Sequence, residues 1–144
     1  MKRSALHTGI LAVGLGRSSP PVTALVSALE GEYQLIASPQ LLDELHAVLQ
    51  QPQFGLGADL AHRWAELIGR AAEVVRTPGR LHVLKRDPAD NYVLKCALQG
   101  EAGYLVTGNL RHFDELKSGE GGEVVYHGVR LLTPREFVES VLDR

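Results

Sequence analysis

Asp90 stands at a position where a carboxylate needs a chemical partner. It follows Asp87 and Pro88, whose residue types suit the N-cap and the first position of a helix. At roughly 100° per residue, Asp90 falls inside the apolar stripe of that predicted helix. The stripe consists of Val93, Leu94, Ala97 and Leu98. A carboxylate in such a stripe must be paired, hydrogen-bonded or bound to a metal ion. Asp90 is therefore either a candidate for chemistry or a cap on the free N–H groups of the first helical turn.

Glu44 is a second candidate acid, on a helix that Ser38 and Pro39 are predicted to open. The same angular arithmetic puts Glu44 at the border of the apolar face and directs Asp43 toward solvent. A border glutamate is typical of a half-exposed surface. Because the helix begins just after the strand predicted over residues 33–37, Glu44 can instead overhang the carboxyl ends of the strands.

A third group of polar residues follows the strand predicted over residues 103–107. Thr107 ends that strand with a hydroxyl group, and Asn109 can offer an amide oxygen close by. Asn109 is equally typical of a turn. Short basic runs near these candidates suit contact with a phosphate backbone, or with solvent alone. The residues of these runs are Lys85, Arg86, Arg111 and His112.

Strand-like and helical segments alternate along the chain and must position these side chains. Strands are predicted over residues 4–7, 33–37, 73–76, 103–107 and 129–132. Helices are predicted over 22–29, 38–49, 58–72, 87–100 and 133–142, while 10–15 fits either type. This alternation is typical of an α/β fold, a three-layer α/β/α sandwich with a parallel sheet of four to five strands. Its ligand crevice is expected beyond the strand ends, after His7, Ala37 and Thr107.

Composition limits the classes of function that remain. The chain has 144 residues, which suits a single domain over 1–144, and its net charge of −2 provides no global basic field for nucleic acid. The one cysteine, Cys96, excludes an internal disulfide and a cysteine-based metal site. No segment has the pattern of a signal peptide or of a membrane span. We therefore expect a cytoplasmic protein without membrane contact.

The ordered set of motifs resembles the PIN-domain ribonucleases, particularly the branch described as VapC-like toxin components of toxin–antitoxin systems. The resemblance extends over nearly the whole chain in order. It rests on residues 38–54, which begin SPQLLDEL, on RDPADN at 86–91, on GYLVTGNLRHF at 103–113 and on LTPREF at 132–137.

The resemblance implies a parallel sheet between helical layers and a site where three or four acids bind Mg²⁺ or Mn²⁺ to cut RNA. Matched residue by residue, Glu44 takes the place of the second acid, Asp90 that of the third, and Asn109 that of a fourth ligand. Thr107 and Asn109 would then orient water or phosphate. The resemblance also implies RNA as a partner, with an antitoxin protein and a second copy of the chain as further partners.

The first acidic motif departs from the family pattern. Where the family has Leu-Asp-Thr-Asn, this chain has Leu6, His7, Thr8 and Gly9. An imidazole suits Mn²⁺ or later transition metals better than Mg²⁺ and removes a negative charge from the site. One hypothesis is a weakened metal-dependent endoribonuclease in which His7 is an atypical ligand or a general base. The other is a catalytically inactive PIN-fold module that binds RNA or an antitoxin.

A further hypothesis comes from residues 14–19, whose sequence GLGRSS faintly suggests a dinucleotide-binding turn. Pro20 and Pro21 argue against it, because they remove backbone N–H groups where a pyrophosphate would bind. In addition, no acid follows the strand predicted over residues 33–37, where one would contact the ribose.

Overall fold

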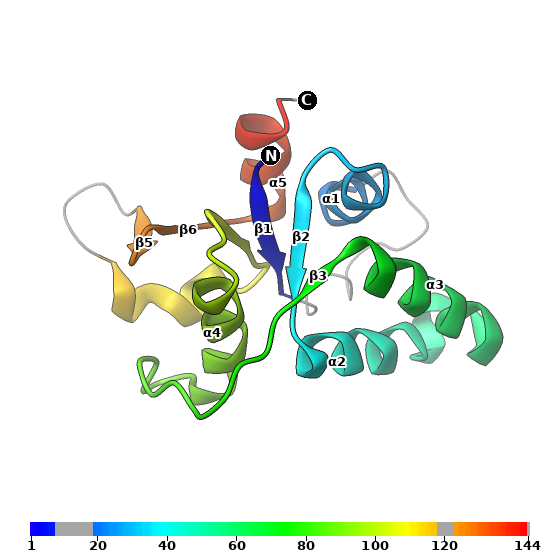
Figure 1. Ribbon diagram of the computed structural model, residues 1–144, viewed down its shortest axis with the longest axis horizontal. Helices are drawn as coiled ribbons and strands as arrows, with labels where there is room; N and C mark the ends of the chain where they lie inside the picture. Colours follow the sequence, from blue (N-terminus) through cyan, green and yellow to red (C-terminus); the bar gives the residue numbers. More distant parts are fainter. Residues whose placement is uncertain (8–18, 118–122, 144) are drawn as a thin grey trace.

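Alternating apolar residues in the strands build two cores, one on each face of a central sheet. The computed structural model describes residues 1–7, 19–117 and 123–143, and its helices cover the sheet on both faces (Figure 1). On one face of the central strands lie Leu6, Leu35, Val106 and Leu132. On the other lie Ala5, Ile36, Leu105 and Leu131. This period of two is the property that fits a strand between two helical layers.

Within the described residues the sheet has six strands, in the order β3-β2-β1-β4-β6-β5. The strands are β1 (Arg3–Leu6), β2 (Gln34–Ala37), β3 (Glu73–Val74), β4 (Tyr104–Val106), β5 (Val124–Tyr126) and β6 (Val129–Leu132). Every neighbouring pair is parallel except β5 and β6, which form an antiparallel hairpin. The α/β class and the parallel sheet are thus confirmed, with one strand more than expected. That strand, β5, is short, and its hairpin turns at His127 and Gly128, both with positive φ.

Five α-helices occur in the described chain: α1 (Pro20–Leu29), α2 (Pro39–Leu49), α3 (Gly57–Ala71), α4 (Asn91–Gln99) and the short α5 (Pro134–Glu136). Three 3₁₀ segments accompany them: η2 (Pro52–Phe54), η3 (Pro88–Asp90) and η4 (Leu110–Leu116). The π-helical turn η5 (Phe137–Val141) continues α5, where a regular helix was expected. None of the described helices has both the length and the apolar character that crossing a bilayer requires.

Helix starts follow the capping residues, with one correction. The Ser38 hydroxyl accepts a hydrogen bond from the Leu41 N–H at 3.2 Å, and Thr133 and Glu136 form a reciprocal capping box. At the start of the Asp90 segment, however, the Asp87 side chain makes no capping hydrogen bond. The chain first forms η3 there and becomes α-helical only at Asn91. Asp87 therefore occupies an N-cap position, but it is that of η3 and not of α4, and it lacks the side-chain hydrogen bond expected of a cap.

The order of the strands determines where the functional side chains meet. β1 lies between β2 and β4, so the carboxyl ends of these three parallel strands share one edge of the sheet. His7 and Thr107 extend β1 and β4: the His7 N–H donates to the Val106 carbonyl and the Thr107 N–H to the Leu132 carbonyl. Segment 10–15 and residues 14–18 of the glycine-containing turn lie outside the described residues.

Candidate functional site

His7 and Thr107 form the floor of the candidate site. Both side chains are buried, and His7 Nδ1 lies 2.9 Å from Thr107 Oγ1. That hydroxyl oxygen also accepts a hydrogen bond from the Asn109 N–H at 3.0 Å. On the other side of the ring, His7 Nε2 faces Asp90 Oδ1 at 3.4 Å. We assign the ring proton to Nε2, because an N–H facing a carboxylate is favourable, and the Thr107 hydroxyl can then donate to Nδ1.

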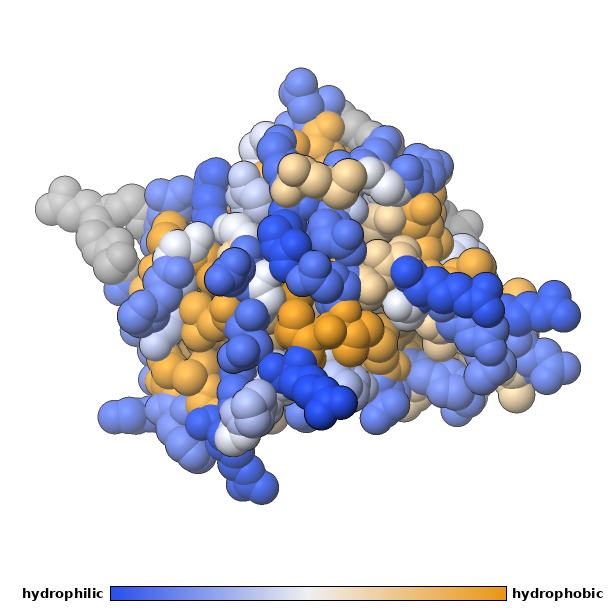
Figure 2. Space-filling model, in the orientation of Figure 1, coloured by the Kyte–Doolittle hydropathy of each residue, from blue (hydrophilic) through white to orange (hydrophobic). Residues whose placement is uncertain are grey.

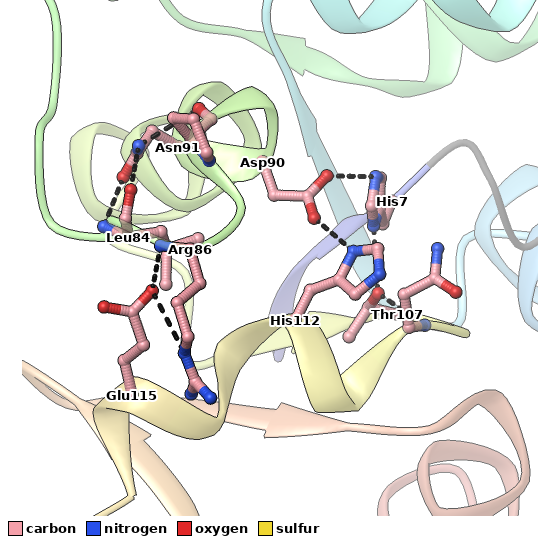
Figure 3. Close-up of polar contacts among 10 residues, drawn as sticks. His7, Leu84, Arg86, Asp90, Asn91, Thr107, His112 and Glu115 are labelled. Atoms are coloured by element: carbon pink, nitrogen blue, oxygen red, sulfur yellow. Dashed lines mark hydrogen bonds and ion pairs between the residues drawn. The ribbon is translucent and has the colours of Figure 1, made fainter.

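Asp90 lies between two imidazoles, as Figure 3 shows. Its second oxygen, Oδ2, is 2.6 Å from His112 Nδ1, and its side chain is 12% exposed. Although Asp90 occupies the N-cap position of α4, it makes no side-chain capping hydrogen bond. Burial of Asp90 therefore fits the predicted stripe position. Its partners are His7, directly after β1, and His112 of η4, rather than the first turn of its own helix.

Glu44 approaches the same place from α2. It is half-buried, whereas Asp43 is exposed, as the helical periodicity predicted. The Tyr92 hydroxyl donates a hydrogen bond to Glu44 Oε2, and the Tyr92 ring lies edge-on to the His7 ring, with centroids 6.4 Å apart. Tyr92 therefore links the second candidate acid to the buried histidine.

Electrostatics around His7 favour the neutral imidazole. Burial lowers the pKa of His7 below its ordinary value of 6.5, and this effect exceeds the opposing influence of the negative charges of Asp90 and Glu44. Any positive charge on His112 acts in the same direction as burial. His7 thus contributes an N–H donor to the site, and no positive charge at neutral pH.

The structure brings four of the five sequence-derived candidates into one neighbourhood: His7, Asp90 and Thr107 in direct contact, and Glu44 through Tyr92. The fifth, Asn109, is joined to Thr107 by its backbone, and its side chain is exposed. Its φ of −112° is outside the left-handed region, so Asn109 is not there to allow a left-handed turn.

The basic residues divide into two groups. His112, predicted to contact phosphate, has its Nδ1 on Asp90 and belongs to the acidic site. Lys85 and Arg86 are exposed, and their backbone N–H groups both donate to Glu115 Oε1 at 2.8 Å. Arg111 is also exposed. These three cations remain candidates for RNA contact.

Sequence reasoning missed Asn91. This side chain is buried and bonds four backbone groups of the preceding segment (Figure 3). Its Oδ1 accepts from the N–H groups of Val83 and Leu84, and its Nδ2 donates to the carbonyls of Leu84 and Pro88. A buried amide directly after Asp90 was the available signal, because such a group must have hydrogen-bond partners.

The donor set departs from what Mg²⁺ requires. Mg²⁺ takes oxygen ligands in near-octahedral geometry, but each oxygen of Asp90 faces an imidazole nitrogen, and a nitrogen donor follows β1. In the part of the chain that the structure describes, no three His, Cys, Asp or Glu side chains are arranged to hold a metal ion. The described residues therefore do not fit an all-oxygen Mg²⁺ centre.

Comparison with known protein families places this geometry in context. A family model described as the PIN domain matches residues 8–111, which is more than half of the chain. The chain belongs to the PIN-domain family. PIN domains have a nuclease-type fold, typically use divalent metal ions and commonly bind RNA. The matched range includes Glu44, Asp90 and Asn109, and it begins directly after His7. No curated protein matches the chain.

Proposed function

We propose that this protein is a PIN-type ribonuclease, of the kind that serves as the toxin of a toxin–antitoxin pair, in which His7 weakens divalent-metal-dependent cleavage. One observation carries the proposal: a buried, neutral imidazole lies 3.4 Å from Asp90, at the strand end where the resemblance expects an aspartate. Glu44 and Asp90 then remain as the carboxylates of the site. Two carboxylates attract a divalent ion less strongly than three, because ion binding depends on ligand charge.

Among the residues at the site, His112 is the group best placed to move a proton. Its Nδ1 contacts Asp90, and its side chain is 42% exposed. In the neutral ring, a proton on Nδ1 directed at the carboxylate leaves Nε2 as a base. By contrast, both ring nitrogens of His7 have partners, and its side chain is 8% exposed. His7 is therefore a positioning residue, which keeps Asp90 in place next to His112.

The contacts of Asp90 also favour a second candidate function, an RNA- or antitoxin-binding module that no longer cleaves. With both oxygens of Asp90 engaged by imidazoles, a cation must displace those contacts before it binds. The two candidates differ in whether the native chain breaks a phosphodiester bond, and an RNA-binding module would share its partner with the ribonuclease.

The substitution His7→Asp separates these candidates. We expect it to raise cleavage of an end-labelled single-stranded RNA in Mn²⁺ or Mg²⁺ by at least about tenfold, because it adds a charged oxygen ligand. His7→Asn is the matched control, because asparagine is similar in size to aspartate and carries no charge. The increase in cleavage should disappear when His7→Asp is combined with Asp90→Asn. A native protein that cleaves well, and loses this activity in both His7→Asp and His7→Asn, would show that His7 is a working part. RNA binding with no cleavage by either the native chain or His7→Asp would support the binding module.

A further inference from the structure

A cavity of about 410 Å³ lies beside the acidic site, between segment 77–82 and the start of α4. Its wall includes Pro88 and Ala89, which directly precede Asp90, and Tyr92, whose hydroxyl contacts Glu44. The volume falls in the range of about 300–1,000 Å³ that is usual for small-molecule sites. We propose that this cavity binds one nucleotide of a single-stranded RNA, adjacent to the phosphodiester presented to Asp90. The proposal rests on RNA being the substrate of the proposed function.

The charge of the cavity selects an anionic ligand. Among the described residues that line it are Arg80, His82 and Lys95, and none of the lining residues is an aspartate or a glutamate. An adjoining hollow shares Gln40 and Thr77 with the cavity and adds Arg76. This basic lining is found on a chain whose net charge is −2. Such a local excess of cations is the footprint of phosphate binding.

The segment that forms one wall of the cavity carries basic residues. Figure 1 shows this segment, between β3 and α4, crossing the lower part of the molecule, where Figure 2 shows hydrophilic side chains next to hydrophobic ones. This segment contains Arg76, Arg80 and His82, and Arg80 is exposed. Lys95 is half-buried, and its ammonium group donates a hydrogen bond to the Pro78 carbonyl, so one cation of the wall is held in place.

The other lining groups suit a base and a ribose. Tyr92 offers an aromatic ring at the boundary between the cavity and the acidic site. Aromatic rings that stack on bases are the usual partners of single-stranded RNA. Gln40 and Thr77 add an amide and a hydroxyl group, which can bond base edges or the ribose 2′-OH. A nucleotide is thus matched at its phosphate, its sugar and its base.

Part of the cavity wall is organised before any ligand binds. Asn91, itself a lining residue, bonds the carbonyl of Pro88 in the wall and the backbone of Val83 and Leu84, which continue the chain from His82. Glu115 in turn fixes the backbone of Lys85 and Arg86, which join these residues to Pro88. A wall that is already ordered does not have to be ordered on binding, which favours affinity. The nucleotide in the cavity would then set the position of the next phosphate over Asp90.

The test is RNA binding by the full chain without divalent ions. A fluorescein-labelled single-stranded RNA of mixed sequence is titrated in EDTA and followed by fluorescence anisotropy at several salt concentrations. We expect Arg76→Ala combined with Arg80→Ala to lower affinity roughly tenfold, and to reduce the slope of log K against log salt by about 0.7 for each phosphate that the variant no longer neutralises. Tyr92→Ala should lower affinity about tenfold, and Tyr92→Phe should retain most of the stacking.

Arg63→Ala is the matched control, since Arg63 is an exposed arginine on α3 and does not line the cavity. Thermal unfolding verifies that each variant is folded, and the arginine pair keeps the test valid should Tyr92→Ala fail to fold. If the native chain binds RNA and the arginine pair binds as tightly as Arg63→Ala, the nucleotide site is refuted and RNA remains the substrate. If the native chain binds no RNA at low salt, both the nucleotide site and the proposed function are refuted. Loss of binding in the arginine pair supports the site even if the native chain cleaves nothing.

Discussion

Removal of the Asn91 side chain should destabilise the protein by about 2–4 kcal/mol. Asn91 is 6% exposed and makes four hydrogen bonds, at 2.9–3.1 Å, to the backbone of Val83, Leu84 and Pro88. A hydrogen bond contributes roughly 0.5–1.5 kcal/mol net, and a buried polar group left without a partner costs about 1–3 kcal/mol. Leu84 is buried, so its N–H and carbonyl bear that cost in Asn91→Ala, whereas Pro88 is exposed and can turn to water.

The measurement is urea-induced unfolding at constant pH, with the free energy of unfolding and its denaturant dependence fitted together. Asn109→Ala is the matched control: this asparagine is exposed, its side chain makes no capping hydrogen bond, and its removal should change stability by less than about 0.5 kcal/mol. Asn91→Asp separates the two halves of the interaction. It retains an acceptor for the N–H groups of Val83 and Leu84, but it places a carboxylate against the carbonyls of Leu84 and Pro88.

The result shows whether the Asn91 side chain stabilises segment 83–88. If Asn91→Ala and Asn109→Ala differ by less than about 1 kcal/mol, the four hydrogen bonds do not hold segment 83–88, and a preorganised cavity wall has no basis. A loss of stability in the expected range, with an unchanged denaturant dependence, would show that the segment is part of the cooperative fold.

Two further results follow from burial. Because the native state holds the pKa of His7 below 6.5, the unfolded chain binds more protons near that pH, and the free energy of unfolding should fall as the pH is lowered through about 6.5. Urea unfolding of His7→Gln should show a shallower dependence of this free energy on pH. Equal pH dependences in the two proteins would contradict a lowered pKa of His7. Burial raises the pKa of the Cys96 thiol to about 11, and the residue is 0% exposed. A thiol reagent near pH 8 should therefore modify the native protein only at the rate of unfolding. Immediate modification would refute the burial of Cys96.

The sequence was sufficient to predict the layers of the fold, because its signals there are local. Alternating apolar residues specify strands with two buried faces, and Ser38 and Thr133 mark helix starts through bonds to residues three positions away. The position of Asp90 in an apolar stripe correctly predicted a buried carboxylate. The parallel order of β2, β1 and β4 then brings its candidate partners to one edge of the sheet.

The side chains that contact Asp90 are distant from it in the sequence, and the periodicity of apolar residues does not predict such contacts. His112 reaches Asp90 because the chain after β4 turns into the 3₁₀ segment Leu110–Leu116, and a basic run alone suggested phosphate contact instead. Likewise, Asp87 satisfied the composition of a cap, but a 3₁₀ turn precedes α4 and leaves its side chain without that role. Tyr92 was absent from the predicted site because an aromatic residue in a helix is usually interpreted as part of the core.

A histidine at the end of β1, where the resemblance to PIN-domain ribonucleases implies an aspartate, changes the interactions that stabilise the site. Three acids at one sheet edge repel one another, and a divalent cation relieves that repulsion when it binds. In this chain, side chains of the protein contact the carboxylates: ring nitrogens of His7 and His112 face the two oxygens of Asp90, and Tyr92 donates a hydrogen bond to Glu44. Both carboxylates therefore have partners in the folded state without a cation. It follows that added Mn²⁺ should stabilise His7→Asp more than the native chain, because an ion that binds only the folded state stabilises it more when it binds more tightly. A native chain that Mn²⁺ stabilises as strongly as His7→Asp would mean that the histidines are ligands, and that they do not take the place of the ion.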